Sequence, residues 1–242
     1  MLYDGLEDLF RETSLGRVHY KRRRGSGTEV LFLHGLAAST QTWARLIERL
    51  PASLGVCLID LLGHGKSDAP EMDYTAAAQA RMVTEFIGLE GLGDCYLFGH
   101  SYGGQVAASM AQGKFKGRGM MLEEPAGLKD QYDDLARDGR LEKVIEEEAR
   151  EARILNLDER VAKSILGNGP KECLTGESLG LVSTPTLLLW GGMDKGVPIK
   201  YGSLFNKYIK GSRLEVIEGA GHVPHYTHPD EVAKAILEFT RN

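Results

Sequence analysis

The sequence predicts an α/β fold with a mostly parallel, doubly wound sheet. Short, continuously apolar segments recur along the chain, as strands buried on both faces of a parallel sheet require, at residues 30–33, 56–60, 95–98, 119–122 and 185–190. Segments with helical spacing of apolar residues separate most of them. Glycine-rich loops follow several of the apolar segments. When strands alternate with helices in this way, the loops that carry binding and catalytic residues lie at the carboxyl ends of the strands.

The predicted elements run in order from a weakly alternating edge strand at residues 17–24. Strand 28–33 follows, then helix 40–50, strand 56–60, helix 74–89, strand 95–98, helix 102–112 and strand 119–122. After an interruption come strand 185–190, a helix near 199–209, strand 214–217 and helix 229–239. We expect the basic run at residues 21–24 to be a solvated hairpin tip.

Residues 126–183 interrupt the alternation with charged, helix-forming sequence. Two apolar stripes recur there at helical spacing: Leu141, Val144, Ile145, Ala149 and Ala152, then Leu157, Val161 and Ile165. Apolar stripes of this kind must pack against another surface, and the open top of the sheet is the surface that remains uncovered. We therefore expect one core, residues 1–125 and 184–242, and a small helical cap inserted at 126–183.

Composition limits the partners and the compartment. A net charge of −5 over 242 residues gives no reason to expect nucleic acid or an anionic membrane as a partner. No apolar run reaches the ~18 residues of a membrane helix, and the acidic start is unlike a signal peptide. The three cysteines, Cys57, Cys95 and Cys173, suit neither a disulfide framework nor a metal site. We expect a cytoplasmic protein, monomeric or homodimeric.

Ser101 lies in Gly99-His100-Ser101-Tyr102-Gly103, where an apolar strand changes into helix-compatible sequence. In a Gly-x-Ser-x-Gly turn the serine occupies a strained corner with its hydroxyl above the sheet. The helix that follows directs backbone N–H groups toward a developing oxyanion. This pattern predicts a nucleophile.

Two later loops supply the imidazole and the carboxylate that a serine nucleophile needs. Asp194 follows the strand at 185–190, and His222 follows the strand at 214–217. A serine hydroxyl is too weak an acid to attack at neutral pH, so an imidazole must take its proton and a carboxylate must orient that imidazole. Glu123 and Glu124, at the end of the preceding strand, are alternative candidates for the carboxylate.

Taken together, these motifs resemble the α/β-hydrolase superfamily, in its esterase and haloperoxidase-like branch, over essentially the whole chain. His34-Gly35-Leu36 is similar to the family's oxyanion loop, and the segment from Asp60 to Asp68 to its loop after the fourth family strand. The resemblance implies Ser101 as nucleophile, Asp194 as acid, His222 as base, and the backbone N–H groups of Leu36 and Tyr102 as the oxyanion hole. It implies no cofactor and no metal.

The remaining histidines favour structural roles. His34, His64 and His100 flank glycines and are expected to hold loop backbone. His222, His225 and His228 have metal-like spacing, but a loop-to-helix segment offers them no shared face, so we expect His225 and His228 at the surface or at a helix cap.

The sequence therefore predicts a serine hydrolase that cleaves small-molecule carboxylic esters with short to medium acyl chains. Lactones, thioesters, carbon–carbon bonds of dienoic acids and perhydrolysis need the same oxyanion site and remain alternatives. A ligand receptor on a hydrolase scaffold is another. Ser101 disfavours haloalkane dehalogenase and epoxide hydrolase, which carry aspartate at the nucleophile position.

Overall fold

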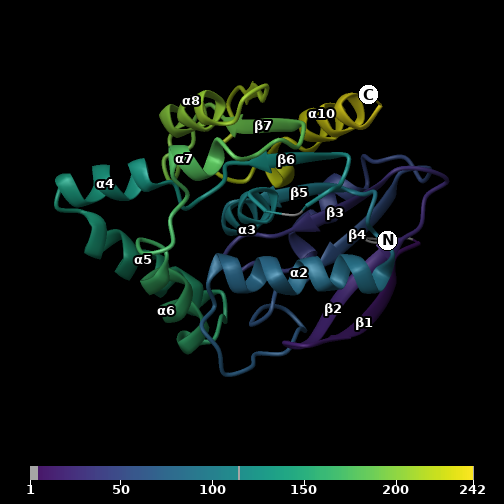
Figure 1. Ribbon diagram of the computed structural model, residues 1–242, viewed down its shortest axis with the longest axis horizontal. Coiled ribbons are helices and arrows are strands. Elements are labelled where there is room, and N and C mark those ends of the chain that lie inside the picture. Colours follow the sequence, from purple (N-terminus) through teal and green to yellow (C-terminus); the bar gives the residue numbers. More distant parts are fainter. Residues whose placement is uncertain (1–4, 114, 242) are drawn as a thin grey trace.

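An eight-stranded sheet organises the computed structural model, which describes residues 5–113 and 115–241 (Figure 1). The strand order is β1-β2-β4-β3-β5-β6-β7-β8, in which β3 to β8 are parallel and β1 and β2 antiparallel. This arrangement confirms the predicted fold class. The strands are β1 (Glu7–Thr13), β2 (Gly16–Arg23), β3 (Glu29–Leu33), β4 (Gly55–Ile59), β5 (Tyr96–His100), β6 (Gly119–Glu123), β7 (Thr186–Gly191) and β8 (Arg213–Ile217).

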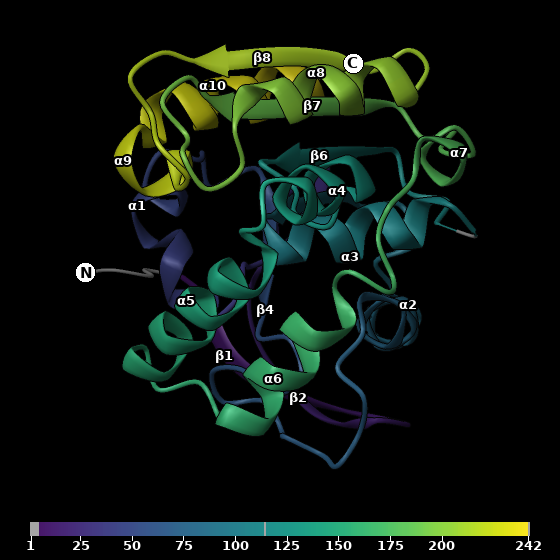
Figure 2. The ribbon, with the colours of Figure 1, turned by 90° about the vertical axis from the view of Figure 1, so that its left-hand side faces the viewer.

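Helices pack on both faces of the sheet (Figures 1 and 2). Helices α2, α3 and α8 share one hydrophobic cluster, and α1 and α10 share the other. Within the described ranges, none of the helices combines the length and apolarity that crossing a lipid bilayer requires. The helices are η1 (Thr40–Trp43), α1 (Ala44–Ile47), α2 (Ala76–Glu90), α3 (Tyr102–Ala111), α4 (Lys129–Arg137), α5 (Leu141–Ile154), α6 (Glu159–Asn168), α7 (Gly176–Leu179), α8 (Ile199–Tyr208), α9 (Pro224–Thr227) and α10 (Pro229–Thr240).

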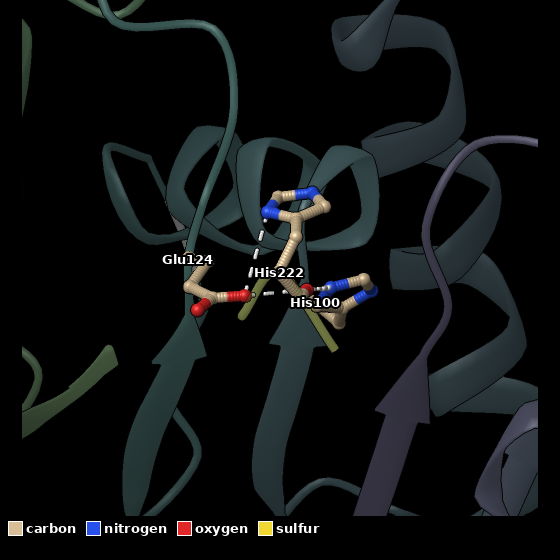
Figure 3. A group of neighbouring side chains, drawn as sticks. All are labelled: His100, Glu124 and His222. Atoms are coloured by element: carbon tan, nitrogen blue, oxygen red, sulfur yellow. Dashed lines mark hydrogen bonds and ion pairs between the residues drawn. The ribbon is translucent and has the colours of Figure 1, made fainter. Parts of the chain in front are cut away.

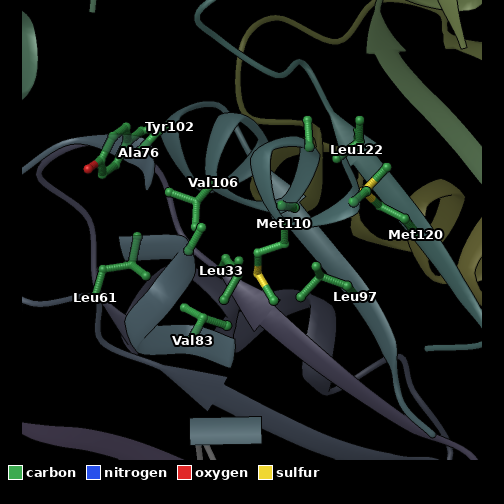
Figure 4. Packing of buried hydrophobic residues seen from close by; sticks show 14 of the residues in the cluster. Leu33, Leu61, Ala76, Val83, Leu97, Tyr102, Val106, Met110, Met120 and Leu122 are labelled. Carbon is green, nitrogen blue, oxygen red and sulfur yellow. The ribbon is translucent and has the colours of Figure 1, made fainter. Parts of the chain in front are cut away.

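Successive residues of the central strands alternate between these two clusters. In β3, Leu31 and Leu33 face α2 and α3, whereas Val30 and Phe32 face α1 and α10. Figure 4 shows Leu33 among the residues of the first cluster, near Val83 of α2. Both faces of the strand are apolar because both are covered.

The amino-terminal strands differ from the prediction. Residues 16–23 form β2, but β2 is not the edge of the sheet, because β1 pairs with it in antiparallel register from Glu7↔Arg22 to Thr13↔Gly16. The strand β1 was not predicted. Its residues are mostly exposed, so it lacks the apolar run that identified the other strands.

The basic run at residues 21–24 is not a solvated hairpin tip. Arg22 lies in β2 with 4% of its side chain exposed. Its guanidinium donates two hydrogen bonds to Glu29, of 2.6 and 2.9 Å, and one of 3.1 Å to the Glu90 carboxylate. A planar guanidinium can be buried in this way because carboxylates match its fork of donors.

The helix predicted at residues 40–50 is replaced by two short pieces, η1 and α1. The Asp60 carboxylate accepts the Thr40 N–H at 2.6 Å, and the Ser39 hydroxyl accepts that of Gln41. These side-chain bonds satisfy the first N–H groups and favour a tight 3₁₀ turn at the start.

Helices α4 to α7 fall within the segment expected to form the cap, and Figure 1 shows α4, α5 and α6 to the left of the sheet. Helix α4 is tied to α8 by Asp134, which accepts from Lys200 at 2.7 Å. Helix α6 is tied to the loop before α2 by Ser164, whose hydroxyl accepts the Tyr74 N–H at 2.8 Å. Val161 is fully buried there, and Leu157 and Ile165 of the same apolar stripe are buried as well.

Candidate active site

Ser101 stands between β5 and α3 in a strained conformation. Its φ of 51° and ψ of −115° lie outside the regions that residues with a side chain prefer. The tight turn brings Gly99 against Gly103, since a Cβ on Gly99 would lie 2.5 Å from the Gly103 carbonyl oxygen. The sequence therefore forms the sharp turn that its glycines predict, with Ser101 at the corner.

The structure brings together the three side chains that the sequence singled out. The Ser101 hydroxyl lies 3.0 Å from His222 Nε2, and His222 Nδ1 lies 2.8 Å from Asp194 Oδ2. Both distances are those of hydrogen bonds. A third of the His222 side chain is exposed, whereas the Asp194 side chain is fully buried. A partly exposed imidazole is thus backed by a carboxylate that water does not reach.

The loop after β7 fixes the Asp194 carboxylate. Its Oδ1 accepts the backbone N–H groups of Gly196 at 2.8 Å and Val197 at 3.0 Å. These bonds leave Oδ2 directed at the imidazole. Bonds to two backbone donors hold a carboxylate in one rotamer, so the position of His222 is determined by the loop.

Two backbone segments adjoin Ser101 where an oxyanion would form. Tyr102 is the first residue of α3, so its N–H has no partner within the helix. The loop containing Leu36 is also close, because a Cβ on Gly35 would lie 3.3 Å from the Ser101 Cβ. The arrangement is compatible with the oxyanion hole expected from Leu36 and Tyr102.

The Tyr102 side chain does not line the site. It is 4% exposed, its hydroxyl donates to the Tyr74 carbonyl at 3.2 Å, and its ring stacks on His64. Its hydrogen bond and packing hold the start of α3 against the loop before α2.

Three histidines were expected to hold loop backbone, and they do so to different degrees. His34 fits fully, since it donates from Nδ1 to the Gly35 carbonyl at 2.8 Å and accepts the Leu61 N–H at Nε2. His64 and His100 each bond one carbonyl, but His64 Nε2 and His100 Nδ1 are buried without a hydrogen-bond partner among the described residues. Burial lowers the pKa of His100 to about 3, so this ring is neutral at pH 7.

Glu124 contacts the same imidazole as Asp194. Its Oε2 lies 3.4 Å from His222 Nδ1, and its Oε1 accepts the Gly191 N–H at 2.7 Å. Asp194 is closer to His222, so the geometry favours Asp194 over its rival as the primary acid. Burial, together with the negative charges of Glu123 and Asp194, raises the pKa of Glu124 to about 10.

This raised pKa predicts that the protein loses stability as the pH rises. Between the unfolded-state pKa of about 4.5 and the folded-state value of about 10, Glu124 holds its proton only in the folded protein. The stability is then fully present below about pH 4.5 and falls by up to about 1.4 kcal/mol per pH unit above it. Glu124→Gln cannot titrate, so the Tm of this variant relative to the wild type should rise steadily from pH 5 to pH 9. A constant difference in calorimetry would contradict the buried, protonated Glu124.

His225 is not at the surface, contrary to the prediction. It is fully buried, its Nδ1 lies 2.5 Å from Glu123 Oε2, and its Nε2 lies 2.9 Å from the Thr42 hydroxyl. Burial lowers the pKa of His225 and raises that of Glu123. Glu123 is therefore committed to His225, which excludes it as the partner of His222. His228 lies at a helix cap as expected, between α9 and α10, and its ring Nδ1 lies 2.9 Å from the Thr227 hydroxyl.

The histidines with metal-like spacing, His222, His225 and His228, do not converge. Among the described residues, the groups with ligand atoms close enough to hold an ion are His100 with Glu124 and His222, and His100 with Glu123 and His225. In the second group Glu123 is already bonded to His225, and in the first His222 Nδ1 is already bonded to Asp194. His228 belongs to neither.

One acidic side chain of the cap interacts electrostatically with this site. Glu148 lies four residues before the buried Ala152 on α5, and therefore on the same stripe of the helix. Its carboxylate interacts electrostatically with His222. Desolvation by neighbouring protein atoms raises the pKa of Glu148, although the residue is exposed. The sequence prediction missed this residue because it appeared as one of many charges on a solvated helix.

Comparison with known proteins agrees with the fold. Residues 30–235 match the model of the alpha/beta hydrolase family. The chain is 27% identical to the pimeloyl-[acyl-carrier protein] methyl ester esterase of Yersinia pseudotuberculosis, over 87% of this chain and 92% of that protein. It is 26% identical to a 2-hydroxy-6-oxononadienedioate/2-hydroxy-6-oxononatrienedioate hydrolase of Burkholderia vietnamiensis, over 93% and 91% of the two chains.

Solved structures show the same fold. A hydrolase from Pseudomonas aeruginosa superposes with a TM-score of 0.81 at 18% identity, over 96% of this chain and 98% of that one. A thermophilic esterase from Thermogutta terrifontis superposes with a TM-score of 0.77 at 24% identity, over 98% of each chain. Because the family model covers most of the sequence, the family is shown: this chain belongs to the alpha/beta hydrolase family, whose members include esterases and other hydrolases.

Proposed function

We propose that this hydrolase cleaves carboxylic esters through an acyl-enzyme formed on Ser101. The single observation that carries the proposal is the continuous path from the Ser101 hydroxyl to His222 and on to Asp194, with contacts of 3.0 and 2.8 Å. In this mechanism His222 Nε2 removes the hydroxyl proton while Ser101 Oγ attacks the acyl carbon. Asp194 stabilises the imidazolium that results.

The tetrahedral oxyanion is held by the backbone N–H groups of Tyr102 and Leu36. Comparable donors each lower the barrier by about 3 kcal/mol. His222 then returns the proton to the leaving alcohol, which departs and leaves the acyl group on Ser101. Water repeats the cycle with His222 as base and releases the acid.

We propose neutral acyl groups of short to medium length as the preferred substrates. The first apolar stripe of the cap, on α5, is half-buried, and the carboxylate of Glu148 on the same helix interacts electrostatically with His222. That charge disfavours substrates whose acyl part carries a carboxylate, because like charges repel across a partly desolvated site.

A carbon–carbon hydrolase is the second candidate, on the strength of the Burkholderia relative named for such dienedioate substrates. Those substrates are anionic, and the charge of Glu148 opposes them. Lactones, thioesters and perhydrolysis would use the same serine, base and oxyanion donors.

A substrate panel tests the proposal. We expect hydrolysis of p-nitrophenyl esters from acetate to decanoate, with an optimum at or below the medium chain lengths. The mono-p-nitrophenyl ester of succinate should react more slowly than the neutral butyrate ester at low salt, and 1 M salt should narrow the gap by screening. Negligible hydrolysis of the whole series would contradict the esterase proposal, and faster cleavage of the anionic ester would contradict the assigned charge preference.

A further inference from the structure

Glu124 is a buried carboxyl group directed at the base of the candidate triad. Figure 3 shows it beside His222 and His100, with its Oε2 3.4 Å from His222 Nδ1 and 3.9 Å from His100 Nε2. This oxygen is buried and has no hydrogen-bond partner among the described residues. A buried polar atom without a partner is costly, so its position calls for an explanation.

The backbone holds Glu124 in this position. Its φ of +47° is unusual for a residue with a side chain. The Glu124 N–H donates to the Leu189 carbonyl at 3.0 Å, and the Gly191 N–H donates to Glu124 Oε1 at 2.7 Å. The surroundings therefore fix both a strained backbone and one carboxyl oxygen, which leaves the other oxygen facing the imidazole.

Four titratable groups face Glu124 from the neighbouring elements: His100 at the end of β5, Glu123 in β6, Asp194 after β7 and His222 after β8. Burial, and after it the negative charges of Glu123 and Asp194, keep the proton on Glu124. In the wild type, Asp194 is therefore the charged carboxylate beside His222.

We propose that Glu124 is a second positioning carboxylate for His222, which takes over from Asp194 when the charge of Asp194 is removed. The proposal rests on the proposed roles of Ser101 and His222. Neutralising Asp194 removes one of the charges that disfavour ionisation of Glu124, so Glu124 releases its proton to solvent at a lower pH than in the wild type. His222 Nδ1–H then donates to the ionised Glu124 Oε2 across a gap of 3.4 Å, which needs only a few tenths of an ångström of adjustment. The imidazole keeps its productive tautomer, and Nε2 still accepts the Ser101 proton.

A double-mutant cycle with Asp194→Asn and Glu124→Gln tests this. The rate at which a fluorophosphonate probe modifies Ser101 reports the activation of the serine and needs no ester substrate. Loss of the orienting carboxylate in a serine hydrolase typically lowers kcat by about 10⁴-fold. We expect Asp194→Asn alone to lower the labelling rate only about 10²-fold, and the double variant to lower it about 10⁴-fold. Equal losses from Glu124→Gln in both backgrounds would overturn the proposal.

The pH profile of Asp194→Asn separates a positioning role from a structural one. Because Glu124 stays buried beside Glu123, it ionises at a higher pH than an exposed carboxyl. The labelling rate of Asp194→Asn should therefore rise with pH as Glu124 ionises. This rise should be absent from the double variant. A profile that coincides with that of the wild type would overturn the proposal, even if the double variant does not fold.

Glu123→Gln in the Asp194→Asn background is the matched control, because Glu123 is the adjacent buried carboxyl but contacts His225 instead of His222. We expect it to keep or raise the labelling rate of Asp194→Asn, because removal of the Glu123 charge lowers the pKa of Glu124. If it lowers that rate as much as Glu124→Gln does, the effect is structural and the proposal fails. Wild-type protein that labels with the probe but hydrolyses no ester would refute the esterase function alone.

Discussion

Replacing Ser101 by alanine is expected to abolish turnover of every ester that the wild type hydrolyses. The change removes the attacking oxygen, and loss of the nucleophile in a serine hydrolase lowers kcat by about 10⁶-fold. Stability should stay within about 1 kcal/mol, because the Cβ remains and only the 3.0 Å hydrogen bond to His222 is lost. Steady-state hydrolysis and thermal melting of the same preparation measure both effects.

The same variant also discriminates among mechanisms. Ester hydrolysis at a wild-type rate would mean that another group, or water alone, attacks the acyl carbon. Loss of activity together with a large drop in Tm would indicate misfolding and require Ser101→Cys, which supplies a nucleophile of similar size, as the second measurement.

Gly103→Ala is expected to have the largest effect on folding, with a loss of at least about 3 kcal/mol of unfolding free energy. A Cβ on Gly103 would lie 2.2 Å from the Leu33 carbonyl oxygen and 2.6 Å from that of His34. Both atoms belong to the backbone at the end of β3, so no side-chain rotation relieves the clash. Helix α3 must then move away from the sheet and carry Ser101 out of line with His222. Urea unfolding measures the loss.

Gly88→Ala is the matched control for this experiment. Gly88 is exposed in α2, and a Cβ there would have no neighbour within 4 Å. Alanine in an exposed helix should be neutral or should stabilise by about 0.5–1 kcal/mol. Similar destabilisation by both substitutions would contradict the steric explanation for Gly103.

The candidate triad could be predicted from sequence because each member carries a local signal. Ser101 lies in a glycine turn, and Asp194 and His222 follow apolar segments. Parallel strands end at one edge of a sheet, so residues that directly follow such strands come together without any knowledge of side-chain contacts. The interior strands could be predicted for the same reason, since burial on both faces leaves a continuous apolar run.

The features that the sequence did not reveal depend on packing between distant segments. His225 is spaced like a surface or cap residue, and only the fold brings Glu123 against it. Arg22 belongs to a basic run that resembles a solvated tip, yet Glu29 and Glu90 meet it inside the structure. Glu124 could be proposed as an alternative to Asp194, but not as a second carboxyl on the same imidazole.

The central claim is that Ser101 carries the acyl group during turnover. The most direct test is to mix the protein with p-nitrophenyl butyrate, quench with acid within a turnover, and map the modified peptide by mass spectrometry. We predict a butyryl group on Ser101, formed in a burst of p-nitrophenol and absent from Ser101→Ala. Rapid release of p-nitrophenol with no acyl group on Ser101, or with the acyl group on another residue, would contradict the account.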